Sequence, residues 1–256
     1  FRMKKPQGGM GVENAPEFSE WVEQVRNQNT AYTLETGKTR KFKIDVFGCQ
    51  MNERDAETIA GMLTDMGFEE VSNDKPADII VFVTCCVREN AEERIYGHIG
   101  RLSGECEENG SIIVACGCMM QQPHVVEKIK KSYHNVKIVF GTHNIHTFPE
   151  LLYRYMTKKR RVFEIWEKVD RVIEELPVKR ADKHKAWVNI ILGCNNFCSY
   201  CIVPYVRGRE RSRDFNDVLS EIKALAKDGC KEVTLLGQNV NSYGNDLGEK
   251  DLFAKL

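Results

Sequence analysis

The chain has 256 residues, 42% of them hydrophobic, and its 37 basic side chains are matched by 37 acidic ones. A chain of this length can form one large domain or two of ordinary size, each with a real hydrophobic core. Because the charges cancel, no net field draws the protein toward nucleic acid, and any contact with RNA must depend on a local basic patch.

Two features bear on location. The longest apolar run, residues 79–87 with Thr84 inside it, is too short to cross a bilayer. The first residues lack the apolar core of a secretory signal. We therefore predict a cytoplasmic protein with no membrane contact. Its ten cysteines are expected to be metal ligands or free thiols, because the cytosol keeps thiols reduced.

The first part of the chain predicts an α/β domain. Residues 1–40 are polar, with one weakly helical piece at residues 18–25, and we interpret them as an N-terminal extension. Residues 41–156 alternate apolar runs with amphipathic segments, which predicts a doubly wound parallel sheet. The expected strands are residues 42–47, 78–83, 111–115 and 136–140, and the expected helices are residues 55–66, 89–102, 124–132 and 147–155.

The second part begins a new unit. Residues 157–185 have mixed charges and no hydrophobic period, which favours a linker, and their basic run at residues 158–161 is interpreted as a solvated face. Residues 186–256 then start a β/α repeat. Its expected elements are a strand at 187–192, a helix at 214–227 and a strand at 232–236. A full (β/α) barrel needs several more units, so we expect a fragment of a larger enzyme.

Three cysteines are expected at the carboxyl ends of successive strands. Cys49 follows the first strand, Cys85 ends the second and Cys118 follows the third. Ligands of open α/β sheets bind at that edge, so these thiols are expected to converge on one site. Cys86 and Cys116 lie one or two positions away, and spacing alone does not decide which of Cys85 or Cys86, and of Cys116 or Cys118, binds metal.

Another three thiols, Cys194, Cys198 and Cys201, follow the apolar run at residues 187–192 and Gly193. Thiolates suit iron–sulfur clusters or zinc, and a cubane cluster normally takes four. Three local ligands would leave one iron open to a small molecule, as catalytic metal sites do. The alternatives are a zinc knuckle, for which a second Cys-x-x-Cys pair is missing, or three buried thiols without metal.

The spacing Cys-x-x-x-Cys-x-x-Cys, with Tyr200 before the last cysteine, resembles the radical S-adenosylmethionine (SAM) enzymes. In that superfamily SAM binds the open iron, and one-electron reduction cleaves it to a 5′-deoxyadenosyl radical. A wider pattern resembles the radical SAM methylthiotransferases. It consists of residues 48–52, 84–92 and 116–121, together with the loop extended to residues 193–213. The likeness covers about residues 41–256, and residues 207–213 and 236–244 resemble tRNA-modifying members most.

The resemblance implies two [4Fe–4S] clusters and SAM as cofactors. One cluster would be held by Cys194, Cys198 and Cys201, and the second by Cys49, Cys85 and Cys118, with Cys86 and Cys116 as neighbouring thiols. It also implies a methylthiotransferase α/β domain at residues 41–156, the start of a radical SAM (β/α) barrel at residues 186–256, and an RNA-binding β domain that this chain lacks. Tyr200, Gln238 and Asn239 are implied as SAM contacts.

The implied reaction adds a methylthio group to carbon 2 of N6-isopentenyladenosine at tRNA position 37. The implied partners are a tRNA anticodon stem-loop carrying that prenylated adenosine and an electron donor such as flavodoxin or ferredoxin. The densest basic stretch near the loop is expected to contact RNA phosphates, with a solvated face or internal ion pairs with Glu210 as the alternative. Its members are Arg207, Arg209, Arg211 and Arg213.

Two other functions stay open at this point. The first is a methylthiotransferase acting on threonylcarbamoyl adenosine or on a ribosomal-protein side chain. The second is a non-catalytic iron–sulfur electron carrier. Binding of SAM would separate the enzymes from the carrier, since a carrier has no reason to leave an iron open.

Overall fold

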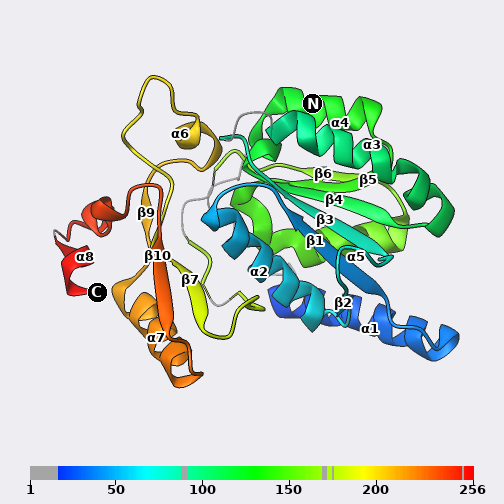
Figure 1. The fold of residues 1–256 in the computed structure, drawn as a ribbon, viewed down its shortest axis with the longest axis horizontal. Helices are drawn as coiled ribbons and strands as arrows, with labels where there is room; N and C mark the ends of the chain where they lie inside the picture. The colour runs from blue at the N-terminus through cyan, green and yellow to red at the C-terminus, as the bar shows by residue number, and fades with distance from the viewer. Residues whose placement is uncertain (1–16, 88–90, 169–171, 175, 250) are drawn as a thin grey trace.

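The computed structural model describes residues 17–87, 91–168, 172–174, 176–249 and 251–256. Its larger part is built on a six-stranded parallel sheet with the strand order β2-β1-β3-β4-β5-β6 (Figure 1). The strands are β1 (Lys41–Val46), β2 (Glu69–Glu70), β3 (Ile79–Thr84), β4 (Ile112–Gly117), β5 (Val136–Phe140) and β6 (Val162–Glu164).

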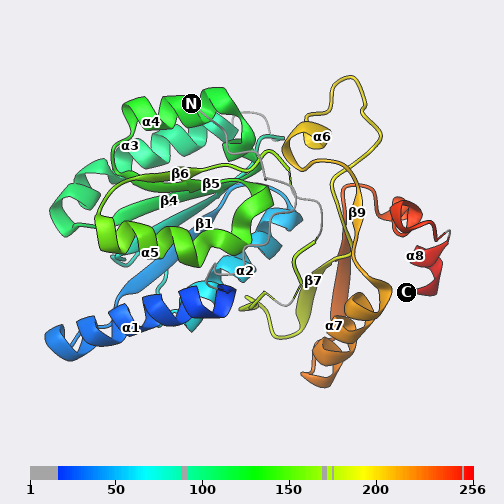
Figure 2. The ribbon, with the colours of Figure 1, turned by 180° about the vertical axis from the view of Figure 1, so that it is seen from behind.

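Helices cover both faces of this sheet, as Figures 1 and 2 show from opposite sides. Side chains of α1, α2 and α5 form one hydrophobic core with one face, and those of α3 and α4 form a second core with the other. The helices are α1 (Phe18–Thr36), α2 (Gln50–Asp65), α3 (Ala91–Asn109), α4 (Pro123–Ser132) and α5 (Phe148–Lys158). The predicted doubly wound parallel sheet is therefore confirmed.

The order of the strands creates a switch point between β1 and β3. From β1 the chain moves to β2 on one side, and it then returns to β3 on the other side of β1. Crossovers that leave in opposite directions open a crevice beyond the carboxyl ends of the two strands. The position of this crevice matters because Cys49 and Cys85 follow those two strand ends.

Residues 18–36, predicted as a weakly helical extension, instead form the long helix α1 against α5. The Trp21 and Tyr153 rings lie 5.2 Å apart, and the Asn29 amide donates to the Met66 carbonyl at 2.8 Å. Only Val22, Val25 and Asn29 are buried on this helix. Its apolar stripe is therefore too narrow to give a clear hydrophobic period.

Residues 157–185, predicted as a linker, include the end of α5 and a strand of the sheet. β6 pairs in parallel with β5, in the register Ile138 with Val162. In the preceding basic run, residues 158–160 are exposed, whereas the Arg161 guanidinium donates hydrogen bonds to four carbonyl oxygens at the end of α4 and beyond. The acceptors are Ile129, Lys130, Tyr133 and Val136. A cation at a helix carboxyl end satisfies carbonyls that lack helical partners.

The smaller part contains one parallel βαβ unit, in which β7 (Lys185–Asn189) pairs with β10 (Glu232–Leu236) and α7 (Phe215–Lys227) lies between them in sequence. The strand expected at residues 187–192 is divided. Its second piece, β8 (Ile191–Leu192), turns away to pair antiparallel with β9 (Arg211–Ser212). Two short helices, α6 (Val203–Val206) and α8 (Leu252–Lys255), complete this part.

None of the described helices is both long enough and apolar enough to span a membrane.

Candidate iron–sulfur site

The three cysteines of the N-terminal sheet lie at its carboxyl edge. Cys49 lies between β1 and the first residue of α2, Cys85 follows β3, and Cys118 begins a short 3₁₀ helix after β4. Cys85 and Cys118 are buried in one small apolar cluster with Val206, which comes from α6 in the other part of the chain. The junction of the two parts therefore lies on these cysteines.

The ends of β1 and β3 approach closely because Gly48 has no side chain. A Cβ atom built on Gly48 would lie 2.7 Å from the Cys85 Cβ and 2.5 Å from the Asn52 amide nitrogen. Real Cβ atoms do not come that close to other atoms, so a larger residue would push the strand ends apart. Position 48 thus requires glycine for a steric reason, next to a cysteine whose role is chemical.

Cys116 and Cys118 lie in different surroundings although only one residue separates them. The Cys116 side chain belongs to the core under the sheet, is 1% exposed, and donates a hydrogen bond to the Phe82 carbonyl. Burial, with a smaller contribution from Asp55, raises the pKa of the Cys116 thiol well above its usual value. The Cys118 sulfur instead accepts a hydrogen bond from the Cys86 backbone N–H at 3.2 Å, at the sheet edge.

Asn52 ties this edge together one turn into α2. Its amide nitrogen donates to the carbonyl oxygens of Phe47 and Thr84, each at 3.0 Å, and so spans the ends of β1 and β3. Its oxygen accepts from the Cys49 thiol at 3.9 Å and from the Arg207 guanidinium at 3.0 Å. All four polar contacts of this fully buried amide therefore involve the cysteine edge or the segment that covers it.

Arg207 is a buried cation from the segment that covers the edge. It is 6% exposed and forms an ion pair with Asp55 of α2 at 3.0 Å. Burial disfavours a charged guanidinium. The negative charge of Asp55, helped by Cys118 and Cys49, outweighs that effect and raises the pKa of Arg207.

The second cysteine group lies on a loop whose start is held by two backbone N–H groups. Gly193 N–H donates to the Gln238 side-chain oxygen at 2.6 Å, and Cys194 N–H donates to the Gly208 carbonyl at 3.1 Å. Cys194 is buried, Cys201 is partly buried and Cys198 is exposed. The loop therefore holds its thiols between the carboxyl end of β8 and the start of β9.

Both cysteine groups fit iron–sulfur ligation by their donor chemistry, since each supplies three thiols. Among the described residues, no three His, Cys, Asp or Glu side chains lie close enough together to share one metal ion. A cubane cluster distributes its cysteines around separate iron atoms, so it does not need them to meet at one point. The buried Arg207 would also offset the negative charge of a thiolate-bound cluster.

The residues predicted to contact SAM lie around the loop. Tyr200 is 90% exposed, and Gln238 follows β10, where its side chain binds Gly193 and touches the Met51 sulfur of α2. Asn239 comes next and donates to the Ser242 hydroxyl at 2.6 Å. Gln238 thus links the loop and the second strand of the βαβ unit to helix α2.

The four arginines of residues 207–213 are not equivalent. Arg207 and Arg213 are buried in ion pairs, and their partners are Asp55, Glu174 and Glu221 rather than Glu210. Arg211 is partly buried and donates to the Arg207 carbonyl at 3.0 Å. Arg209 is exposed and lies over the Phe197 ring at 5.0 Å.

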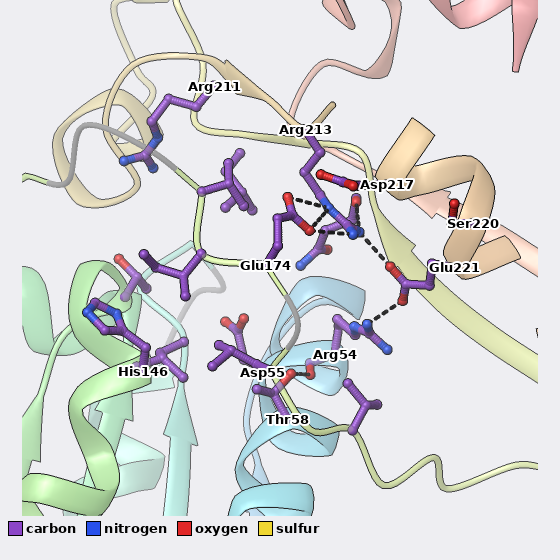
Figure 3. A pocket seen from close by; sticks show the side chains of 18 of the residues that line it. Arg54, Asp55, Thr58, His146, Glu174, Arg211, Arg213, Asp217, Ser220 and Glu221 are labelled. Carbon is purple, nitrogen blue, oxygen red and sulfur yellow. Dashed lines mark hydrogen bonds and ion pairs between the residues drawn. The ribbon is translucent and has the colours of Figure 1, made fainter. Parts of the chain in front are cut away.

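A pocket of about 720 Å³ lies between the two parts of the chain. One wall carries a chain of ion pairs that runs from Arg54 through Glu221 and Arg213 to Glu174 (Figure 3). No pattern in the sequence predicts this arrangement, because Arg54 and Glu221 are 167 positions apart. Only the unusual density of arginines at residues 207–213 pointed toward this region.

His143 is a further buried group of the pocket that sequence reasoning missed. It is 4% exposed, faces Gly208, and its Nε2 atom has no hydrogen-bond partner among the described residues. Burial, followed by the nearby charges of Arg211 and Arg207, lowers the pKa of His143 to about 4. The imidazole is therefore neutral at physiological pH, beside two guanidinium groups.

Fold and site together define a protein in which a cysteine-bearing α/β sheet precedes a radical SAM cysteine loop. Comparison with known families agrees, since residues 41–141 match the uncharacterized protein family UPF0004 and residues 188–256 match the radical SAM superfamily. Membership of that superfamily implies SAM and a [4Fe–4S] cluster as cofactors.

Curated relatives extend the match across both parts. Three of them are named tRNA-2-methylthio-N(6)-dimethylallyladenosine synthase. The protein of Acetivibrio thermocellus is 49% identical over 92% of this chain and 49% of its own length. The protein of Clostridium tetani is 52% identical over 89% of this chain and 51% of its own length. The protein of Clostridioides difficile is 46% identical over 99% of this chain and 53% of its own length. The chain is similar to these relatives over most of its own length, and it spans about half of theirs.

Proposed function

We propose that the full-length protein is a radical SAM enzyme that adds a methylthio group to carbon 2 of N6-isopentenyladenosine in tRNA. One observation carries this proposal: Val206, five residues after the last cysteine of the SAM loop, packs on Cys85 and Cys118 of the other group. Two thiol groups that serve one reaction must lie near one substrate. This contact, within the described residues, supports that arrangement.

The cofactors would supply what side chains lack. Carbon 2 of a purine carries an unactivated C–H bond that no side-chain base ionises, so a SAM-derived radical, generated at a reduced cluster, supplies the hard step. Cys194, Cys198 and Cys201 would hold that cluster. Gln238 would hold the loop in place by accepting the Gly193 N–H.

A second cluster on Cys49, Cys85 and Cys118 is part of the same proposal, as bearer and source of the sulfur. Its support is the shared edge of β1, β3 and β4 and the separate, core position of Cys116. Cys86 would stay a neighbouring thiol whose backbone N–H faces Cys118. The α/β domain would then be the sulfur-bearing domain, and the βαβ unit the start of a (β/α) barrel.

Contacts to SAM and tRNA are proposed more narrowly. Tyr200 is exposed on the loop, and Gln238 and Asn239 lie at the carboxyl end of β10, where barrel enzymes bind substrates. Arg209, exposed over Phe197, is the member of the basic stretch best placed to meet an RNA phosphate. The substrate would be a prenylated anticodon stem-loop, with flavodoxin or ferredoxin as electron donor and the cytoplasm as location.

The proposal is tested by separating radical generation from sulfur supply in the full-length protein. After anaerobic reconstitution, Cys49→Ala should still cleave SAM to 5′-deoxyadenosine but form no methylthiolated nucleoside. Cys198→Ala should form neither product, because it lacks the iron that binds SAM. Both products are measured by mass spectrometry in the same reaction. Loss of 5′-deoxyadenosine in a Cys49→Ala protein that retains its loop cluster would contradict this division of roles.

The same assay decides between the remaining substrates. With a prenylated anticodon stem-loop, a threonylcarbamoylated stem-loop and a ribosomal-protein peptide as competing substrates, only the first should gain a methylthio group. If no substrate is modified and SAM does not change the electron paramagnetic resonance (EPR) spectrum of the loop cluster, the protein is an electron carrier instead.

A further inference from the structure

The residue that connects the two candidate cluster sites is Arg207. It follows α6 and reaches across the junction to α2, where it contacts Asn52 and Asp55, each at 3.0 Å. Its neighbour Val206 covers Cys85 and Cys118, and the Val206 carbonyl accepts a hydrogen bond from Thr142 at 2.8 Å. Six residues after Cys201, the chain is thus fastened to the sheet edge that carries the other thiols.

The order of groups along α2 determines how the ion pair of Arg207 with Asp55 is oriented relative to the cysteines. Cys49, Asn52 and Asp55 follow one another at three-residue intervals, so each lies about one turn further from the sheet edge. Arg207 bridges the second and third of them. It shares the Asn52 oxygen with the Cys49 thiol, whereas Asp55 lies about two turns, roughly 9 Å, along the helix from Cys49. The positive end of the pair therefore faces the cysteines.

We propose that Arg207 is a positioning residue which tunes the sulfur-bearing cluster, making the cluster on Cys49, Cys85 and Cys118 easier to reduce. This inference rests on the proposed function, because it assumes that cluster. One-electron reduction makes the cluster more negative by one charge, and a buried cation close by stabilises the reduced form more than the oxidised one. Asp55 holds the cation in place and partly opposes its field.

Charge and packing make different predictions, and a pair of near-isosteric variants separates them. Arg207→Met removes the cation and leaves Asp55 unbalanced, so the cluster should become harder to reduce. Asp55→Asn removes the anion and leaves Arg207 unbalanced, so the cluster should become easier to reduce. A role in packing alone would make both variants lose the same contact, and their effects would then have the same sign.

The experiment uses full-length protein in which Cys194, Cys198 and Cys201 are alanine, so that only the second site can bind a cluster. After anaerobic reconstitution, the parent should hold about four irons. Dithionite then donates electrons one at a time while EPR follows the reduced cluster. In Arg207→Met, the equilibrium constant for one-electron reduction of the cluster should be at least tenfold smaller than in the parent. This corresponds to a reduction potential lower by about 59 mV for a one-electron couple.

Two further proteins complete the design. Arg207→Lys keeps the charge and loses the planar fork, so its potential should stay nearer the parent's than that of Arg207→Met. Asp55→Asn should move the potential in the opposite direction to Arg207→Met, and it can be measured even if Arg207→Met fails to hold iron. Potentials that are unchanged, or that move together in Asp55→Asn and either arginine variant, would overturn the inference. A parent without iron would instead overturn the second cluster of the proposed function.

Discussion

At the scale of single residues, Cys116 and Cys118 show how the end of a strand separates core from site. The sulfur of Cys116 faces the core and donates to Phe82, whereas that of Cys118 lies at the sheet edge with Cys85. Cys118→Ala should therefore lose about one cluster, or four of eight irons per full-length chain, after reconstitution.

Cys116→Ala is the matched control for that variant. It removes the same sulfur from a fully buried position, so it should cost about 1 kcal/mol of stability while keeping nearly all the iron. Iron analysis and urea unfolding of both variants provide the check. If Cys116→Ala lost half the iron and Cys118→Ala none, the ligand assignment would be reversed.

His143 makes the stability of the chain depend on pH. Its pKa of about 4 in the folded protein lies below the unfolded value of about 6.5, so the folded state favours the neutral ring. The stabilisation is fully present above about pH 6.5 and is lost as the pH falls through 4. The difference is roughly 3 kcal/mol. Urea unfolding at pH 7, 5.5 and 4.5 should show this loss.

Replacing the ring identifies the group responsible for that slope. His143→Gln should flatten the dependence between pH 7 and 4.5, because glutamine does not titrate. His134→Gln, at an exposed position, should leave it unchanged. Equal slopes in the wild-type and His143→Gln proteins would show that another group titrates.

At the scale of elements, the local sequence predicted the strands that are buried on both faces of the sheet. It missed the short strands whose formation depends on a partner strand. β3 and β4 are fully buried and rich in β-branched residues, and their predicted bounds differ from the observed ones by at most two residues. β8 and β9 have two residues each, and β6 has three. Such strands exist because a partner lies alongside, and no hydrophobic period can form over that length.

The start of the cysteine loop gives a prediction at this scale. Gly193 has φ +80°, and a Cβ there would collide with the Gly208 carbonyl at 2.5 Å and with that of Arg209. Gly193→Ala should therefore cost more than the ~1–2 kcal/mol of a left-handed alanine. It should also displace the loop, so that about one of the two clusters is lost on reconstitution.

Gly229 provides a control with the same backbone requirement. Its φ is +89°, but no atom lies within 4 Å of a Cβ built there. Gly229→Ala should lower the stability only by the cost of an alanine in the left-handed conformation, and it should keep both clusters. Thermal unfolding and iron content of the two variants separate backbone strain from collision. Equal effects would mean that the close approach at Gly193 does not constrain the loop.

At the scale of the whole molecule, the docking of residues 203–213 on α2 was beyond reach of the sequence. The ion pair of Arg207 with Asp55 joins residues 152 positions apart, and a run of arginines gives no sign of which members will be buried. The expectation that all four would face RNA treated them as one surface. Folding turned two of them inward because carboxylates on α2, α7 and residues 172–174 compensate their charge.

The carboxylate of Glu221 is the centre of that junction, since it binds Arg54 of α2 at 2.5 Å and Arg213 at 2.7 Å. Glu221→Gln leaves Arg54 and the Glu174-paired Arg213 with less compensation in a largely buried place, and should lower the free energy of unfolding by about 2 kcal/mol. The exposed pair of Lys185 with Glu232, at 3.3 Å, offers a control: Glu232→Gln should cost at most about 1 kcal/mol.

Urea unfolding measures the destabilisation by Glu221→Gln and by Glu232→Gln. The double variant Arg54→Met/Glu221→Gln tests whether the effect of Glu221→Gln arises from its ion pair with Arg54. If Arg54 and Glu221 act on each other across the junction, the double variant should be less destabilised than the sum of its single variants. Protease cleavage within residues 176–184 should also become faster in Glu221→Gln, because that segment lies along the pocket between the two parts. Strict additivity, with cleavage at the wild-type rate, would mean that the ion pair of Arg54 with Glu221 does not hold the two parts together.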